Sequence, residues 1–229
     1  MAAFDSLDKA SGASNTGHSR KRKNEKSDED KYVALDCEMV QTIASHSALA
    51  RCTIVDRVGD VVYDSYVRPN ESIVDFRTQY SGVHPHHMKT AKAFFVAQNE
   101  IKEVIRGKYV VGHTVHTDFE SIGIEHPEDK IIDVTQLPVL RKALGLGAGS
   151  KPTVSLQRMT KALLCEDIQT GAHSSLEDAW ATMRLFLLSL DPSKIPANVV
   201  LPPGRRRNRP FKWVAKTSND RRTTTSNNG

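Results

Sequence analysis

The stretch from Lys31 to Val40, KYVALDCEMV, is the feature that most constrains how this chain can fold. Its residues 32–35 form an apolar, partly β-branched run, which predicts a buried strand. Asp36 and Glu38 then interrupt the run near its end. Because side chains at i and i+2 of a strand share a face, we expect both carboxylates to project the same way. Buried carboxylates need compensating charge, and a divalent cation could supply it for two acids on one face. The segment alone fits equally well a strand that leaves the core with its acids in water.

Charge is unevenly distributed along the 229 residues. Residues 201–229 carry eight Lys or Arg against one acid, whereas residues 32–200 carry 17 against 20. The formal net charge of +5 therefore comes from the ends. An acidic middle suits a protein that binds a polyanion only if bound metal neutralises some of the acids. The basic ends would add general attraction to phosphates.

The composition predicts three regions. Residues 1–30 are polar and rich in Ser, Asn, Lys and Asp, and are expected to be disordered. Residues 31–190 are expected to form one compact domain, and residues 191–229 a basic tail. The three cysteines, Cys37, Cys52 and Cys165, show no CxxC spacing, which argues against a disulfide-stapled secreted domain and against a zinc finger. Neither a secretory signal nor an apolar run of about 18 residues is seen, so we expect a soluble protein in a reducing compartment, without a membrane partner.

The periodicity of the middle region predicts a mixed α/β sheet flanked by helices. An antiparallel hairpin block comes first and βα alternation follows. After the first strand we expect strands at 50–57, 60–67, 109–111 and 131–134, helices at 90–106, from 118, at 153–164 and at 175–190, and loops at 72–88 and 145–149.

Two further acids and a histidine lie at positions that suit a site. Asp118 follows a short strand, where α/β folds tend to place ligand-facing groups. Ser174 and Glu177 fit a capping box at the start of the last helix. His173 and Asp178 then occupy the two positions that usually hold an apolar staple, which predicts a polar pair beside a helix N-terminus. Taken alone, His173 fits a loop histidine; beside four carboxylates it fits a catalytic one.

Three motifs carry a family resemblance: ALDCEMV at 34–40, VGHTVHTDFESI at 111–122, and HSSLEDAWATMRLF at 173–186, which has the H-x4-D spacing. SALARCTIVD at 47–56, YVRP at 66–69 and VDFRTQYSGV at 74–83 agree as well. Over residues 31–190 the chain resembles the DEDDh family of 3′→5′ exonucleases, and within it the RNA exonuclease 4 and interferon-stimulated 20 kDa exonuclease group. The resemblance implies an RNase H-like fold.

The resemblance also implies a catalytic set. Two divalent ions, Mg²⁺ or Mn²⁺, would be held by Asp36, Glu38, Asp118 and Asp178, whose four charges match a total of about +4. By similarity, Asp36 bridges the ions, Glu38 and Asp178 help to hold the ion that binds the attacking water, and Asp118 acts through the water shell of the second ion. His173 is the expected general base.

Substrate contacts follow from the same resemblance. Met39 is expected against the terminal base, and the backbone around Cys37 at the terminal 3′-hydroxyl. Arg77 is expected at the sugar or phosphate, although a surface ion pair is the alternative. Ser81 belongs to a loop, residues 80–82, that is expected to close the nucleotide pocket. The histidines of HPHH at 84–87 fit no zinc spacing and are expected to be solvated.

Both ends contain basic clusters. Arg20–Lys23 is either a nuclear import signal or a solvated charge run. Gly204–Trp213 mixes arginines with Phe and Trp, which suits single-stranded nucleic acid or a second nuclear or nucleolar signal. We therefore expect the nucleus, and within it the nucleolus.

The leading hypothesis is a metal-dependent 3′→5′ exoribonuclease that releases nucleoside 5′-monophosphates from single-stranded RNA, in ribosomal RNA processing or RNA turnover. The same chemistry on DNA is one alternative. A non-catalytic RNA-binding adaptor that keeps the fold is the other, although a pure binder has no use for four acids and a histidine.

Overall fold

The computed structural model describes residues 31–147 and 153–203. The expectations for residues 1–30, for the basic clusters at 20–23 and 204–213 and for part of the 145–149 loop fall outside these ranges. Within them, no helix combines the length and the apolar character that a membrane span requires.

A mixed seven-stranded sheet forms the centre of the fold, in the order β5-β3-β2-β1-β6-β7, with β4 paired to β1. β1 lies antiparallel to β2 and to β4 but parallel to β6, so the hairpin block and the βα block meet at this strand. The predicted fold class, an RNase H-like α/β sheet with flanking helices, is confirmed. The strands are β1 Tyr32–Thr42, β2 Ala48–Asp56, β3 Val61–Arg68, β4 Ile73–Asp75, β5 Lys92–Ala93, β6 Tyr109–Gly112 and β7 Ile131–Asp133.

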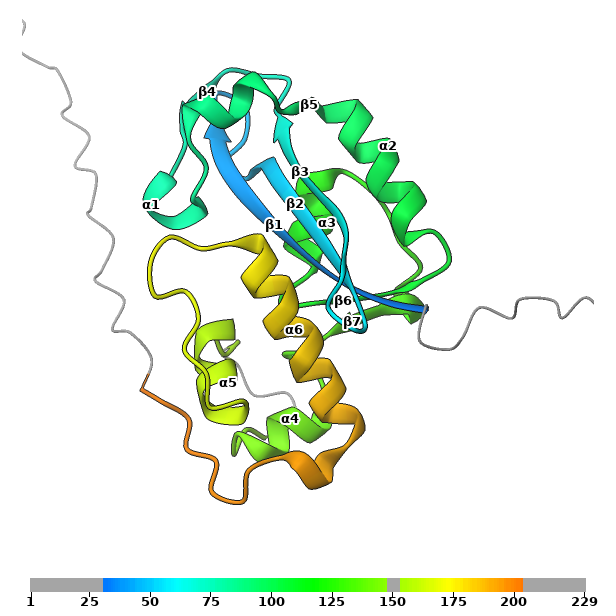
Figure 1. The fold of residues 1–229 in the computed structure, drawn as a ribbon, viewed down its shortest axis with the longest axis vertical. Coiled ribbons are helices and arrows are strands. Elements are labelled where there is room, and N and C mark those ends of the chain that lie inside the picture. Colours follow the sequence, from blue (N-terminus) through cyan, green and yellow to red (C-terminus); the bar gives the residue numbers. More distant parts are fainter. Residues whose placement is uncertain (1–30, 148–152, 204–229) are drawn as a thin grey trace, which may run out of the picture.

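Helices cover both faces of the sheet (Figure 1). Ala34 and Val111 pack with apolar residues of α4, α5 and α6, whereas their neighbours Val33 and Val110 pack with α2 and α3. This alternation is the period-2 pattern of a strand buried on both sides. The helices are α1 Thr78–Ser81, α2 Phe94–Ile105, α3 His116–Ile122, α4 Pro138–Ala143, α5 Leu156–Leu163 and α6 Ser175–Leu190, with 3₁₀ turns at Pro85–Lys89, Glu128–Lys130 and Pro192–Lys194.

The longest helix, α6, is attached to the turn between β2 and β3 by a side chain from its second turn. The indole Nε1 of Trp180 donates a 2.7 Å hydrogen bond to the carbonyl of Gly59, in the turn that joins β2 to β3. That turn is itself tight, since Gly59 has φ 97° and Oδ1 of Asp56 accepts from the N–H groups of residues 58–60. Beyond α6, Ile195, Val199 and Leu201 still pack against the core; the boundary at 190 stays a prediction.

Several element boundaries differ from the sequence-based expectation. The first strand, expected to end close to its acids, runs on to Thr42, because its outer end pairs with β4. The helix predicted from Thr90 begins at Phe94, because residues 92–93 pair with β3 instead. The helix predicted from Asp118 begins at His116. The expected 72–88 loop contains β4, α1 and a 3₁₀ turn, and α4 was not predicted.

The pairing of β1 with β2 is interrupted beside the second acid. Glu38 lies opposite Arg51, but Met39 lies opposite Leu49, so Ala50 is an extra residue on β2. Such a bulge bends the strands locally and changes the direction of the side chains around it.

Candidate active site

Four carboxylates from three distant parts of the chain form one electrostatic cluster. Asp36 and Glu38 come from β1, Asp118 from α3 and Asp178 from the first turn of α6. Burial raises the pKa of Asp36 well above its ordinary value, and the charges of Asp118, Asp178 and Glu38 raise it further. The sheet and the two helices therefore bring together the acids that the motifs single out.

Glu38 is buried, with 6% of its surface exposed. Burial, followed by the charge of Asp178, raises the pKa of Glu38 to about 8, although Arg51 and a hydrogen bond from the backbone N–H of Ser175 act in the opposite direction. That N–H is at the N-terminus of α6, where a helix favours a carboxylate. The interpretation of these acids as a solvated strand end is wrong for Glu38.

Asp118 is equally enclosed. Burial raises the pKa of Asp118 to about 8, against the effect of hydrogen bonds from the thiol and the backbone N–H of Cys37. These contacts join α3 to β1 between Asp36 and Glu38. The position of Asp118 is thus fixed by the strand that carries the first two acids.

Asp178 is held by a loop residue that sequence reasoning missed. Nε2 of Gln169 donates to Oδ2 of Asp178 at 2.8 Å, and the backbone N–H of Gln169 donates to Oε2 of Glu177 at 2.9 Å. Burial raises the pKa of Asp178 to about 6, and the bond from Gln169 limits the rise. Ser174 is the N-cap, as expected, but its side chain makes no capping bond. The predicted capping box is therefore wrong, because Glu177 binds Gln169.

His173 lies beside this acid. Its Nδ1 is 3.9 Å from Oδ2 of Asp178, and its side chain is 41% exposed. Its backbone N–H donates to the carbonyl of Tyr80 at 2.7 Å. The histidine is therefore next to the buried acids and open to solvent, a combination that suits proton exchange with a bound water.

The carboxylates present suit divalent cations. Among residues 31–147 and 153–203, Oε1 of Glu38 and Oδ1 of Asp178 are buried and have no hydrogen-bond partner. A buried carboxylate oxygen without a partner is costly, and carboxylate oxygens are the ligands that Mg²⁺ prefers. In the described ranges, which include the histidines at 84–87, no three His, Cys, Asp or Glu side chains are arranged as a finished metal site.

Comparison with known families identifies the domain. Residues 33–186 match the model of the RNase T family, described as exonuclease. The chain belongs to this exonuclease family.

Curated proteins similar to this chain carry nuclease names. Interferon-stimulated 20 kDa exonuclease-like 2 from Bos taurus is 47% identical over 163 residues, which are 69% of this chain and 46% of the relative. Apoptosis-enhancing nuclease from Rattus norvegicus is 45% identical over 69% of this chain and 48% of its own length. RNA exonuclease 4 from Candida glabrata is 42% identical over 68% of this chain and 59% of its own length. The chain thus spans about half the length of these relatives, and it groups with the family members that its motifs resemble.

Solved structures agree with the fold of the exonuclease. The catalytic unit of Neurospora crassa Pan2 superposes with a TM-score of 0.62 at 28% identity and covers 75% of this chain and 28% of that one. A Saccharomyces cerevisiae Pan2 module in complex with AAGGA RNA gives a TM-score of 0.60 at 26% identity, over 72% of this chain and 29% of that one.

The expected substrate residues of the exonuclease lie along β1 and α1. Cys37 is 7% exposed, so a contact with substrate would come from its backbone. Met39 is half-buried against the α2–α3 side of the core. The side-chain hydroxyl of Ser81 is occupied within its own turn, since it donates to Phe76 at 2.8 Å and accepts from Val83 at 3.1 Å. Substrate contacts by these residues stay predictions.

Arg77 is placed next to β1 by an unusual backbone conformation. It has φ 50°, which is uncommon for a residue with a side chain, and its backbone N–H donates to Oδ1 of Asp75 at 2.8 Å. One terminal nitrogen of the guanidinium, Nη2, donates to the amide oxygen of Gln41 at 3.3 Å. This partner is neutral and lies on the strand that carries the acids. Strained residues of this kind concentrate at functional sites.

A pair of buried hydroxyls behind the acids was also missed. Thr53 of β2 lies opposite Asp36, and its Oγ1 is 2.7 Å from Oγ of Ser175. Both residues are fully buried. The pair fixes the N-terminus of α6 to the sheet, and with it His173 and Asp178. No sequence signal pairs residues so far apart, because the contact depends on how α6 crosses β2.

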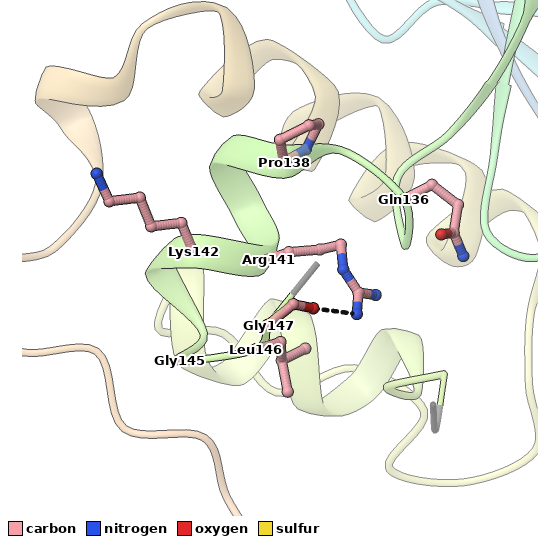
Figure 2. A pocket seen from close by; sticks show the side chains of 7 residues that line it. All are labelled: Gln136, Pro138, Arg141, Lys142, Gly145, Leu146 and Gly147. Carbon is pink, nitrogen blue, oxygen red and sulfur yellow. Dashed lines mark hydrogen bonds between the residues drawn. The ribbon is translucent and has the colours of Figure 1, made fainter. Parts of the chain in front are cut away.

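A pocket of about 520 Å³ lies elsewhere, around α4 and the turn that follows it (Figure 2). Its lining contains none of the four carboxylates. The guanidinium of Arg141 at this pocket donates to the carbonyls of Thr135 and Gly147, at 3.0 and 2.9 Å. This arginine therefore closes the turn after α4.

Proposed function

We propose that this exonuclease is a metal-dependent 3′→5′ exoribonuclease of the DEDDh type, which releases nucleoside 5′-monophosphates from single-stranded RNA. The observation that carries the proposal is a pair of buried oxygens beside His173, Oε1 of Glu38 and Oδ1 of Asp178, which have no partner in the part of the chain that the structure describes. A protein that only binds RNA gains nothing from such a costly arrangement.

Asp36, Glu38, Asp118 and Asp178 would hold two divalent cations, Mg²⁺ or Mn²⁺. Bound there, the cations would polarise the scissile phosphate and stabilise the leaving 3′-oxygen. Burial raises the pKa of all four acids, and the charges of the neighbouring acids of the cluster raise those of Asp36 and Glu38 further. Compensation of this charge makes cation binding favourable despite the cost of burial.

His173 accepts the proton of the attacking water. Its ring is exposed on one side, where water can reach it, and has Asp178 on the other. The nearby carboxylate favours the protonated imidazole that forms in this step. The bonds that Gln169 makes to Asp178 and Glu177 hold this end of α6 in place while the proton moves.

RNA is the proposed substrate because of the names of the similar proteins. The relatives include RNA exonuclease 4, and the similar Pan2 module is described in complex with RNA. DNA remains the alternative substrate for the same site. With this activity we propose a role in ribosomal RNA processing or RNA turnover, and, on the basic clusters of the sequence alone, a location in the nucleus, including the nucleolus.

A cleavage assay tests the reaction. RNA and DNA oligonucleotides of the same sequence, labelled at the 5′ end and ending in a 3′-hydroxyl, are incubated with the protein in Mg²⁺, Mn²⁺ or EDTA. We expect a ladder that shortens by one nucleotide from the 3′ end, only with metal, and faster on RNA. Faster cleavage of DNA would overturn the choice of substrate, and binding without cleavage would favour the adaptor.

Replacement of His173 tests the mechanism. We expect His173→Ala to lower turnover by about 10²–10⁴-fold, as for the loss of a general base. The rise in Tm on addition of Mn²⁺ should persist, because the carboxylates remain. His46→Ala is the matched control, since this histidine is exposed in the turn between β1 and β2. Unimpaired turnover in His173→Ala would remove His173 from the mechanism.

A further inference from the structure

The short helix α1 is attached to the segment that carries His173. Figure 1 shows α1 beside the loop that leads into α6. The contact is a 2.7 Å hydrogen bond from the backbone N–H of His173 to the carbonyl of Tyr80. The two residues are far apart in the sequence, so this bond joins the turn that contains Arg77 to the expected general base.

Gly82 makes the contact close. It ends α1 with φ 64°, and its N–H donates to the carbonyl of Thr78 at 3.0 Å. A Cβ at this position would lie 2.9 Å from the carbonyl oxygen of His173 and 3.8 Å from Cβ of Ala172. A separation of 2.9 Å is shorter than real Cβ contacts, and the opposing atom belongs to the backbone. Any other residue at 82 would therefore push the two segments apart.

The turn around Gly82 cannot easily absorb such a push. The hydroxyl of Thr78 donates to the carbonyl of Val83 at 2.6 Å, and the hydroxyl of Ser81 donates to the carbonyl of Phe76 at 2.8 Å. The N–H of Val83 in turn donates to the hydroxyl of Ser81 at 3.1 Å. Val83 and Ser81 are also buried. Displacement would therefore fall on the more exposed His173.

We propose that Gly82 is a positioning residue for His173: the absence of a side chain lets the α1 turn pack against His173 and hold its imidazole beside Asp178. Since Arg77 begins the same turn, a nucleotide bound by that turn and the general base keep a fixed relative position. The effect of Gly82 on catalysis rests on the proposed function, but its effect on the position of His173 can be measured without any activity assay.

Gly82→Ala is compared with Gly107→Ala in the full-length chain. Gly107 also has positive φ, 72°, but an added Cβ would meet nothing within 4 Å. Both variants carry the same backbone strain, and only the first crowds His173. We expect kcat to fall about 10–100-fold in Gly82→Ala, as when a residue behind the reacting groups is lost, and to change little in Gly107→Ala. The Mn²⁺-induced rise in Tm should persist in both. A Gly82→Ala enzyme with wild-type kcat would overturn the proposal.

The double variant Gly82→Ala/His173→Ala separates positioning from general damage. If Gly82 acts through His173, the double variant should be no slower than His173→Ala alone. If the double variant instead lost activity by the product of the two single losses, the proposal would be overturned. Gly82→Asn and Gly107→Asn form a second pair, because Asn tolerates positive φ but still brings a Cβ. This pair replaces the first if Gly82→Ala does not fold.

An NMR measurement tests the placement without activity. In protein labelled with ¹³C and ¹⁵N at histidine, the ring signals of His173 are assigned from their loss in His173→Ala. We expect these signals to shift in Gly82→Ala and to stay in place in Gly107→Ala. Unshifted signals would overturn the positioning role. A wild-type protein without nuclease activity but with shifted signals in Gly82→Ala would instead overturn the proposed function alone.

Discussion

The two strands that flank β2 differ in how their acids are compensated. On β3, Asp64 accepts from Nε and Nη2 of Arg51 at 2.9 and 2.7 Å and from the hydroxyl of Thr53 at 3.1 Å. On β1, Glu38 lies directly opposite Arg51, yet its Oε1 has no partner among the described residues and its pKa rises to about 8. The guanidinium that could compensate Glu38 is thus bound to the next strand.

The difference separates a structural acid from acids that fit a reaction. Asp64 and Arg51 form a two-bonded pair at low exposure, which fixes the register of β2 and β3. The negative charges around Glu38 lack a matching positive charge. Such a cluster can bind cations, but it lowers the stability of the protein while no cation is bound. Activity and stability should therefore respond in opposite directions to changes in the two groups.

The largest expected contrast is in activity. Asp36→Asn should lower cleavage of 3′-hydroxyl RNA by about 10³-fold, because it removes a charge at the reacting centre. Asp64→Asn should lower it by only about tenfold, since Asp64 bonds to Arg51 and Thr53 behind the site. Single-turnover rates at saturating Mn²⁺ measure both. Equal losses of the cleavage rate would contradict the distinction between Asp64 as a structural acid and Asp36 as a catalytic one.

A second contrast concerns pH and metal. The folded-state pKa values of Glu38 and Asp118, about 8, and of Asp178, about 6, lie above their ordinary values. Between pH 5 and 8 the folded protein therefore holds protons that the unfolded chain has released, so stability should fall as pH rises. In EDTA we expect a loss of a few kcal/mol, about 10 °C in Tm.

Metal should remove most of this pH dependence. Bound Mg²⁺ or Mn²⁺ replaces the protons as the compensating charge, so Tm should vary less with pH. Thermal scans at pH 5, 6, 7, 8 and 9 in EDTA and in millimolar metal measure the difference. Identical slopes in the two series would contradict the idea that the cluster is a cation site.

The smallest expected effect is on stability, which the two substitutions should change in opposite directions. At pH 9 in EDTA, Glu38→Gln should stabilise the protein by about 1–2 kcal/mol, because it removes a buried charge but keeps the shape. Asp64→Asn should destabilise it by about the same amount, since it weakens bonds to a charged partner. Chemical denaturation measures both. Near pH 5, where Glu38 is protonated, its substitution should have little effect.

The acids of the candidate site could be predicted from the sequence, but several hydrogen bonds that hold them in place could not. Asp36 and Glu38 were found because their spacing and the apolar run before them are local signals. Gln169 was missed, because its side-chain bond to Asp178 depends on how the loop before α6 is folded. The same loop explains the wrong capping box, since Gln169 engages Glu177.

In the fold, too, local features could be predicted from the sequence and those that depend on distant segments could not. The hairpin of β2 and β3 and the helix α6 follow from local periodicity, and the structure has them within one or two residues of their expected limits. The extension of β1 to Thr42 and the late start of α2 depend on pairing with β4 and β3 respectively. Pairing between distant segments leaves no periodic trace in either one, so these features could not be predicted from the sequence.

The extra residue at Ala50 divides the β1–β2 hairpin into two independent lengths. On one side of it the ladder aligns Asp36 and Glu38 with β2, and on the other it aligns Met39 and Val40. A change in the length of the 43–47 connection could be absorbed by sliding the outer length alone. The outer ends of the two strands could thus shift while Asp36 and Glu38 keep their alignment with β2.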